Sequence, residues 1–130
     1  MTLDEWCRNA IGVPFVQDGR DYDGWDCWGL VVCAYRDVLG IELPNYTFGG
    51  VKHLARQFRD RASPLWQPCD RQPMAITCIY RRGAVIHAGI MVDKRRIIHV
   101  EEGIDTCLER VTNMRIEGTY VPFGSGSASI

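Results

Sequence analysis

Three residues of this sequence have the types and spacing that nucleophilic catalysis needs: Cys27, His87 and His99. Cys27 lies where the loop "DGWD" changes into the apolar segment "CWGLVVCAY". A thiol in the first turn of a helix meets the positive end of the helix dipole and unpaired backbone N–H groups, which favour the thiolate and could bind an oxyanion. Asp26, directly before it, is a typical N-cap residue. Cys27 is therefore a candidate nucleophile, provided that the fold brings a base to it.

A cysteine in a helix is more often a small apolar core residue than a nucleophile. We assign that structural role to Cys33, which lies in the middle of the same predicted helix and outside its apolar stripe. For Cys27, the choice between a core position and catalysis depends on whether a base lies nearby.

The candidate bases are His87 and His99, which are twelve residues apart in two segments with the character of strands. If Val92 opposes Arg96 in a hairpin, His87 opposes Glu101, and His99 is its diagonal neighbour on the same face. His99 could then hydrogen-bond one nitrogen of His87 and leave the other for the thiol, as in a triad. A shift by one residue would separate the histidines unless a bulge restored them. Each histidine taken alone is more often a half-buried, hydrogen-bonded imidazole than a catalytic residue.

Zinc binding is the alternative chemistry for the same residues, because Cys27, His87 and His99 could form an open three-ligand site. The six cysteines include no CxxC pair, which argues against a zinc ribbon or a thioredoxin-like motif. We therefore predict no metal and no organic cofactor. The third histidine, His53, falls in a predicted helix where we expect solvent exposure.

The elements that must position these residues change in type along the chain. Thr2 and Glu5 fit a capping box before a helix over 3–10, and apolar residues at helical spacing predict further helices over 27–39 and 51–61. After a proline-rich loop, short segments rich in β-branched and aromatic residues indicate strands. The predicted strands are 75–80, 84–92, 96–101, 106–112 and 119–123. Helices followed by a run of strands indicate an α+β fold with an antiparallel sheet.

The composition is that of an ordinary globular protein, with 46% hydrophobic residues, 24% charged residues and a formal net charge of -1. Such a charge gives no long-range attraction to nucleic acid. No apolar run approaches the roughly 18 residues of a membrane span, and no secretory signal precedes the first helix. We therefore expect synthesis in the cytoplasm, no membrane insertion and reduced thiols. The length predicts one domain over 1–123 and a flexible tail over 124–130.

The stretches "GVPFVQDGRDYDGWDCWGLV", "GIELP" and "HAGIMVDKRRIIH" together resemble the NlpC-type cysteine peptidases, which cleave peptidoglycan stem peptides. The resemblance covers about residues 9–101 and rests on an Asp-Cys-x-Gly-Leu-Val turn, a His-x-Gly-Ile strand and a second histidine twelve residues later. It implies a papain-like α+β domain whose nucleophile helix packs on an antiparallel sheet. Cys27 matches the nucleophile of the family, His87 its base, and His99 the polar residue that orients the base.

Two positions near the nucleophile depart from the pattern of the family. Many members carry Pro-Tyr where this chain has a proline followed by Phe15, so a hydroxyl group there is either lost or supplied by Tyr22. Trp28 stands where serine is common, and the resulting "DCWG" variant is similar to short members encoded with bacteriophage tail genes. We expect Asp26, Trp28, Phe15 and Tyr22 to support the active site and its oxyanion.

The resemblance thus implies a cysteine hydrolase that cleaves amide bonds in peptidoglycan stem peptides and acts at the host cell wall as part of a phage tail. It implies synthesis in the bacterial cytoplasm without a signal peptide, with stem peptides and phage tail proteins as partners. Two alternatives stay open at this point. One is a structural tail-assembly protein with little activity, and the other is a thiol acyltransferase on the same fold.

Overall fold

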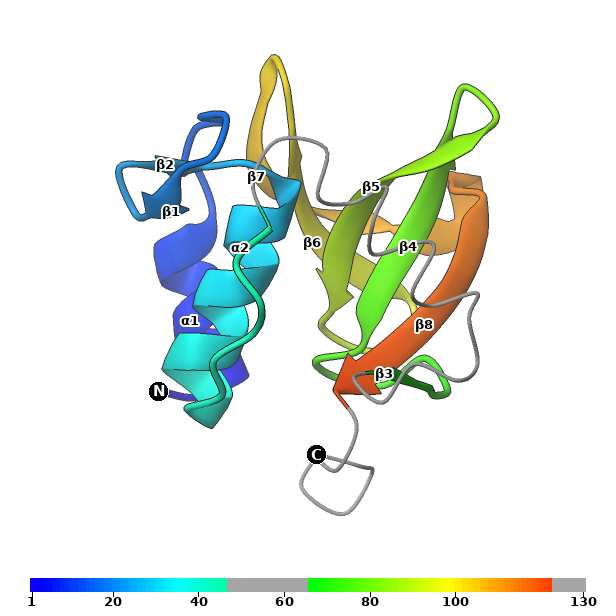
Figure 1. Cartoon of the computed structure of the whole chain (residues 1–130), viewed down its shortest axis with the longest axis horizontal. Helices are drawn as coiled ribbons and strands as arrows, with labels where there is room; N and C mark the ends of the chain where they lie inside the picture. Colours follow the sequence, from blue (N-terminus) through cyan, green and yellow to red (C-terminus); the bar gives the residue numbers. More distant parts are fainter. Residues whose placement is uncertain (47–65, 123–130) are drawn as a thin grey trace.

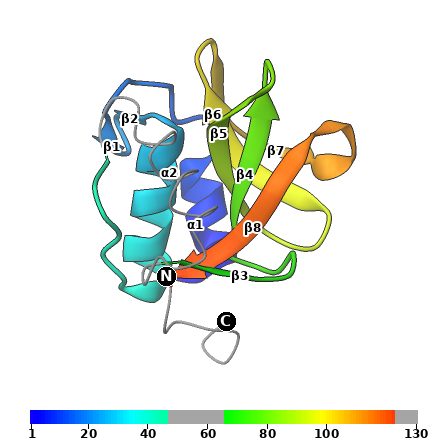
Figure 2. The same ribbon diagram turned by 45° about the vertical axis from the view of Figure 1, so that its right-hand side comes forward.

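The structure, a computed structural model, describes residues 1–46 and 66–122. Figure 1 shows helices α1 and α2 on one side of the molecule and a strongly curved sheet on the other. The turned view in Figure 2 shows the two helices next to each other, again beside the sheet. None of the helices in the described residues is long and apolar enough to cross a membrane. The arrangement is the α+β fold that the order of the elements predicts.

The elements are short and follow one another closely. In chain order they are α1 (Leu3–Ala10), β1 (Arg20–Asp21), β2 (Gly24–Trp25), α2 (Cys27–Ala34), the π-helical turn η1 (Tyr35–Leu39), β3 (Trp66–Pro68), β4 (Ile76–Arg81), β5 (Ala84–Met91), β6 (Arg96–Glu101), β7 (Ile104–Arg110), the 3-10 turn η2 (Val111–Asn113) and β8 (Ile116–Pro122).

The first helix, α1, has the capping box that its sequence predicts. The Thr2 hydroxyl accepts a hydrogen bond from the Glu5 backbone N–H at 3.1 Å, and the Glu5 carboxylate accepts one from the Thr2 backbone N–H at 3.4 Å. Trp6, Cys7 and Ala10 are buried on one face, as their helical spacing requires. The predicted first helix is therefore confirmed.

The second helix, α2, begins at Cys27 and continues without a break into η1. Gly40 ends it with a φ of 67°, a left-handed conformation that glycine adopts without steric cost. These two elements together confirm the predicted helix over 27–39. Cys33 lies outside the apolar stripe in the sequence, yet it is fully buried because β1, β5 and β6 all contact α2. Its assignment as a core residue is confirmed.

Among the described residues, six strands form an antiparallel sheet in the order β3-β8-β4-β5-β6-β7. The five strands predicted from the sequence correspond to β4, β5, β6, β7 and β8. The short strand β3 lies in a segment predicted as a loop, because the prolines of this segment are typical of a loop and interrupt the alternation expected of a strand. The hairpin of β1 and β2 likewise lies within a predicted loop. The predicted helix over 51–61, the expected exposure of His53 and the predicted tail over 124–130 lie outside the described residues.

The hairpin of β5 and β6 has the register on which the meeting of the two histidines depends. Ile90 pairs with Ile98, and the Val92 N–H donates to the Arg96 carbonyl at 3.0 Å. A Cβ atom on Gly89 would lie 2.8 Å from the Ile98 carbonyl oxygen, so glycine permits this close approach of β6. The predicted register is confirmed.

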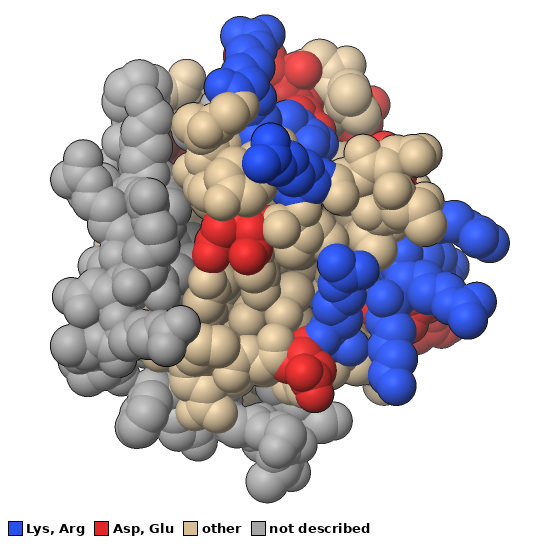
Figure 3. Space-filling model, turned by 90° about the vertical axis from the view of Figure 1, so that its right-hand side faces the viewer, with Lys and Arg blue, Asp and Glu red and all other residues tan. Residues whose placement is uncertain are grey.

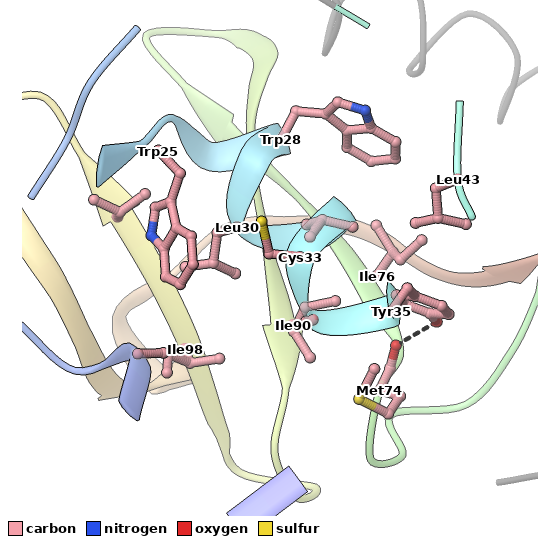
Figure 4. Packing of buried hydrophobic residues seen from close by; sticks show 14 of the residues in the cluster. Trp25, Trp28, Leu30, Cys33, Tyr35, Leu43, Met74, Ile76, Ile90 and Ile98 are labelled. Carbon is pink, nitrogen blue, oxygen red and sulfur yellow. Dashed lines mark hydrogen bonds between the residues drawn. The ribbon is translucent and has the colours of Figure 1, made fainter. Parts of the chain in front are cut away.

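Two hydrophobic cores lie on opposite faces of the sheet. The larger core packs Trp28, Leu30 and Tyr35 from the helical layer against Ile90 and Ile98 from β5 and β6 (Figure 4). Because side chains alternate along a strand, the neighbouring residues point to the other face. There they form the smaller core of Ala75, Ile79, Met91, Ile97 and Val111.

Thr106 of β7 ties the N-terminal loop to the edge of the sheet. Its hydroxyl donates to the Val13 carbonyl at 2.9 Å and accepts from the Trp25 indole N–H at 2.8 Å. Its backbone carbonyl accepts from the Gly12 N–H at 2.9 Å. Trp25 in turn stacks on Trp6 of α1, with ring centroids 5.7 Å apart. This buried set of contacts joins α1, β2 and the sheet.

The surface carries charges of both signs. Figure 3 shows lysine and arginine side chains gathered on parts of the face on the sheet side, with acidic side chains among them. The basic run Lys94 to Arg96 at the β5–β6 turn is exposed, and Arg96 pairs with Asp93 at 2.9 Å. The side chains of this run therefore lie in solvent.

Candidate active site

Cys27 is the first residue of α2, and Asp26 is the N-cap of that helix. The Asp26 carboxylate accepts hydrogen bonds from the Gly29 N–H at 2.8 Å and the Asp18 N–H at 2.9 Å. Arg20 donates to the same carboxylate at 2.8 Å in a partly buried ion pair. The predicted cap is confirmed, and these three contacts hold Cys27 at the start of the helix.

The Cys27 sulfur lies between the start of α2 and β5. Burial raises the pKa of this thiol to about 12, and the negative charge of Asp26 acts in the same direction. The backbone N–H groups of Ala88, Trp28 and Cys27 act in the opposite direction, but they do not outweigh the effect of burial on the pKa. Burial and the Asp26 charge therefore outweigh the lowering of the thiol pKa that the helix N-terminus by itself would give.

His87 of β5 and His99 of β6 are in direct contact. The Nε2 atom of His87 lies 2.8 Å from the Nδ1 atom of His99, and the two side chains are 4% and 2% exposed. The hairpin therefore places the histidines together as its register predicts. Since Nε2 of His87 is bonded to His99, Nδ1 is the nitrogen that can serve a further partner. Ala88, the next residue of β5, brings its backbone N–H to the Cys27 sulfur.

Glu101 and Arg81 complete the surroundings of the histidine pair. The Glu101 Oε1 atom lies 3.6 Å from His87 Nε2 and 3.7 Å from His99 Nδ1. Arg81, at the end of β4, donates to both oxygens of this carboxylate, at 2.7 Å and 3.2 Å. This bidentate hydrogen bond is the largest cause that lowers the pKa of Glu101. A negative charge is thus fixed beside both imidazoles.

The histidines are neutral at rest despite that negative charge. Burial lowers the pKa of His87, and the Glu101 carboxylate only partly opposes this effect. Burial lowers the pKa of His99 in the same way, against the opposing charges of Glu109 and Glu101. The raised pKa of Cys27 favours its thiol at neutral pH, and the lowered pKa of His87 favours its neutral imidazole.

The outer nitrogen of His99 faces the edge strand β7. His99 is directly opposite Cys107, and its Nε2 atom lies 3.6 Å from the Glu109 carboxylate. This distance is too long for a hydrogen bond, and the buried Nε2 has no hydrogen-bond partner among the described residues.

The residues predicted to support the site take different positions. Trp28 turns its ring into the core, where its indole N–H donates to the Pro44 carbonyl at 2.8 Å, so only its backbone N–H faces the Cys27 sulfur. Phe15 is half-buried and forms an isolated bridge with Trp25.

Tyr22 does not supply the hydroxyl group that Phe15 lacks. Its hydroxyl donates to the Asp37 carboxylate at 2.7 Å, beyond the far end of α2. Asp37 is ten residues after Cys27, which corresponds to about 15 Å along a helix. The expected role of Tyr22 at the nucleophile therefore does not fit its position.

Sequence reasoning missed Arg81 and Arg20. Arg20 connects the Asp26 cap to the loop after η1, because it donates to the Asn45 side chain at 2.5 Å and to the Tyr46 carbonyl. No periodic pattern marks either arginine, since both act through contacts between distant segments. Glu101 had one available signal, its place opposite His87 in the predicted hairpin.

The zinc site weighed for Cys27, His87 and His99 does not form as a cluster. Within residues 1–46 and 66–122, two groups of side chains are close enough to share a metal ion, and Cys27 belongs to neither. One group is His87, His99 and Glu101, and the other is His99, Cys107 and Glu109.

A thiol, a paired imidazole and several backbone N–H groups at a helix N-terminus can perform acyl transfer. The thiol can attack a carbonyl carbon, the imidazole can take its proton, and the N–H groups can stabilise the oxyanion. The position of each of these groups follows from α2 and the β5–β6 hairpin.

Comparison with known proteins relates the chain to the NlpC/P60 family, whose model matches residues 12–121. No curated protein sequence matches the chain. The structure is similar to the crystal structure of the NlpC/p60 domain of the peptidoglycan hydrolase SagA, with a TM-score of 0.67 and 19% identity. That alignment covers 92% of this chain and 95% of the other.

Two longer chains share the fold. A Staphylococcus aureus protein described as similar to a lipoprotein of the NLP/P60 family gives a TM-score of 0.66 and 18% identity, over 94% of this chain and 40% of that one. NlpC2 from Trichomonas vaginalis gives a TM-score of 0.59 and 17% identity, over 92% and 46%. This chain thus spans less than half of either relative.

Proposed function

Because this chain belongs to the NlpC/P60 family, we propose that it is a cysteine hydrolase that cleaves amide bonds in peptidoglycan stem peptides. Cys27 is the nucleophile, His87 the base, and His99 the residue that orients the base. The observation that carries the proposal is the 2.8 Å contact between His87 and His99 on the two strands that contact α2, the helix that begins at Cys27. The similar fold of a domain from a peptidoglycan hydrolase supports the substrate class. No metal or organic cofactor takes part.

The first step creates charge from a neutral pair. As the Cys27 sulfur bonds to the substrate carbonyl carbon, its proton passes to Nδ1 of His87. The Glu101 carboxylate, 3.6 Å from the other ring nitrogen, stabilises the imidazolium that forms. Burial therefore keeps Cys27 as a thiol before the reaction. Its attack on the substrate carbonyl depends on proton transfer to His87.

The second step releases the amine. The carbonyl oxygen becomes an oxyanion, which the backbone N–H groups of Cys27 and Trp28 stabilise. When the tetrahedral intermediate collapses, the C–N bond breaks and His87 gives its proton to the leaving amine. The acyl group is now a thioester on Cys27. A water molecule then attacks the thioester and gives a proton to His87. The second collapse releases a carboxylic acid and restores the thiol.

The finer parts of the proposal rest on the resemblance of the motifs. The scissile bond is the γ-D-glutamyl linkage to the diamino acid of the stem peptide. The chain is synthesised in the bacterial cytoplasm and acts at the host cell wall from a phage tail, which the "DCWG" variant supports. Residues 1–123 form the catalytic domain, and stem peptides and tail proteins are its partners.

Incubation with purified peptidoglycan fragments under reducing conditions, followed by mass spectrometry, tests the proposal. We expect cleavage by the parent protein and a loss of about a thousandfold or more in Cys27→Ala and His87→Ala, because each removes part of one catalytic unit. Cys69→Ser is the matched control, since Cys69 is another half-buried free thiol, next to β3. It should cleave like the parent.

Other outcomes separate the alternatives. Equal cleavage by the parent and by Cys27→Ala would contradict the assignment of the nucleophile. Turnover that requires an added amine acceptor would indicate an acyltransferase. No cleavage by a folded parent, with normal particle assembly by Cys27→Ala, would indicate a structural tail protein.

A further inference from the structure

The buried outer nitrogen of His99 makes none of the contacts that the proposed hydrolysis uses. His99 is 2% exposed, and its Nε2 atom has no hydrogen-bond partner among the described residues. A buried polar atom without a partner costs free energy, so its surroundings are informative. It points toward the edge strand β7, where Cys107 pairs with His99 and Glu109 follows two residues later.

We propose that His99, Cys107 and Glu109 bind a divalent transition-metal ion of the zinc class. One imidazole nitrogen, one sulfur and one carboxylate oxygen from these residues lie within 4.8 Å of one another. Nitrogen, thiolate and carboxylate are the ligands that zinc prefers, and three protein ligands leave a fourth position for water. Soft thiolate also discriminates against magnesium and calcium, which prefer oxygen ligands.

The geometry of the strands favours this group. Cys107 is the direct cross-strand neighbour of His99 in an antiparallel pair, and Glu109 lies on the same face of β7. The Glu109 side chain is 50% exposed, and Cys107 is half-buried, so an ion can arrive from solvent while the buried imidazole is already oriented. Orientation of a histidine ligand through its other nitrogen is a recurrent feature of metal sites.

The other group of side chains close enough to share a metal ion, formed by His87, His99 and Glu101, is less suited to binding one. His87 Nε2 and His99 Nδ1 are bonded to each other at 2.8 Å, and Arg81 holds both Glu101 oxygens. A metal there would have to break both arrangements. At the β7 site, the imidazole nitrogen is available without such a loss.

The proposed function gives metal binding a consequence for catalysis. Catalysis needs an unprotonated Nδ1 on His87, so His87 carries its hydrogen on Nε2 and donates it to His99 Nδ1. His99 then carries its own hydrogen on Nε2. A metal needs the lone pair of that Nε2, so the His99 hydrogen moves to Nδ1 and is donated to His87 Nε2. His87 now carries its hydrogen on Nδ1 and cannot accept the Cys27 proton. Only Cys107 releases a proton to solvent. Metal at this site therefore inhibits hydrolysis.

Titration of the reduced protein with Co²⁺, followed by absorption spectroscopy, tests binding without any substrate. We expect one Co²⁺ to bind per chain. Its visible absorption bands should have the high intensity typical of tetrahedral coordination, and a thiolate-to-cobalt charge-transfer band should appear in the near ultraviolet. Cys107→Ser should lose the charge-transfer band, and Glu109→Gln should weaken binding by about tenfold or more. Cys27→Ala and Cys69→Ser should keep the band, because neither residue belongs to the site.

Two results would overturn the site: no thiolate band in the folded parent, or a band that survives in Cys107→Ser. A band lost in Cys27→Ala but kept in Cys107→Ser would instead assign the metal to the nucleophile. These outcomes do not depend on whether the protein is a hydrolase.

Inhibition is tested separately with Zn²⁺ on the hydrolysis of peptidoglycan fragments. We expect inhibition that a chelator reverses and that is about tenfold weaker or more in Cys107→Ser, each protein being compared with its own rate without metal. Equal inhibition of parent and Cys107→Ser would overturn the link to the His99 tautomer even if Co²⁺ binds as expected.

Discussion

The chemistry of Cys27 depends on how much water reaches its sulfur. The backbone N–H groups of Cys27 and Trp28 at the start of α2, and that of Ala88 in β5, favour the thiolate, but burial and the Asp26 carboxylate favour the thiol more strongly. Burial also lowers the pKa of His87, which favours its neutral form. The resting site thus carries a neutral pair, and substrate attack has to be coupled to proton transfer.

The protonation state of Cys27 predicts how it reacts with iodoacetamide. Only the thiolate reacts, so the alkylation rate constant should rise about tenfold per pH unit, without a plateau, from about pH 7 to about pH 9. Deprotonation increases with pH, and a pKa raised to about 12 moves the plateau beyond this range. Mass spectrometry of the Cys27 peptide after timed alkylation measures the rate.

The unfolded protein is the reference for this experiment. In denaturant, the rate at Cys27 should level off near the ordinary cysteine pKa of about 8.5. A plateau at or below neutral pH in the folded protein would mean a thiolate–imidazolium pair, contrary to our assignment.

At the scale of elements, the β5–β6 hairpin decides whether a base meets its orienting partner. His87 and His99 come together because the pairing of Ile90 with Ile98 sets the register. Gly89 permits the approach, since an added Cβ would lie 2.8 Å from the Ile98 carbonyl oxygen and 2.6 Å from the Ile97 side chain.

Substitution of Gly89 should therefore strain the hairpin. We expect Gly89→Ala to lower the free energy of unfolding by about 1–3 kcal/mol, because overpacking against backbone has to be relieved by a strand shift. Urea denaturation measures this loss, and hydrolysis should fall with it as the histidines separate.

Gly118→Ala in β8 is the matched control. An added Cβ there would meet the Tyr120 hydroxyl at 2.7 Å, which is the end of a side chain and can move more easily than backbone. Its loss of stability should be clearly smaller. Equal losses for the two variants would contradict the role given to Gly89.

At the scale of the whole molecule, the two layers are joined by polar contacts as well as by the larger core. Thr106 accepts the Trp25 indole N–H and donates to the Val13 carbonyl from a position that is 2% exposed. The loop that precedes the nucleophile helix is thereby attached to the edge strand β7.

Loss of that hydroxyl should destabilise the fold as a whole. We expect Thr106→Val to lower the free energy of unfolding by about 1–3 kcal/mol, because the shape is kept while the buried Trp25 N–H loses its acceptor. Thermal or urea unfolding measures the change.

Thr77→Val is the control, because Thr77 is also buried but its hydroxyl accepts no hydrogen bond from the described residues like that from the Trp25 indole. The Thr77 hydroxyl makes a long 3.4 Å bond to the Ala75 carbonyl, which also accepts the Met91 N–H at 2.9 Å. Its substitution should cost less than about 1 kcal/mol. If both valine variants were equally stable, Thr106 would not join the layers as described.

The sequence by itself determined the features that depend on neighbours along the chain. The capping box at Thr2, the apolar helix that starts at Cys27 and the alternation in β5 and β6 are local patterns with fixed periods. The hairpin register follows from alternation and a short turn, so even the contact of His87 with His99 could be predicted.

Only the tertiary structure decided what depends on atoms from distant segments. The neutral state of Cys27 follows from its burial against β5, which no helix N-terminus reveals. Arg81 reaches Glu101 across strands, and Tyr22 bonds Asp37 instead of approaching the nucleophile. Desolvation and ion pairing depend on three-dimensional distance, and spacing along the chain does not encode that distance beyond one element or one hairpin.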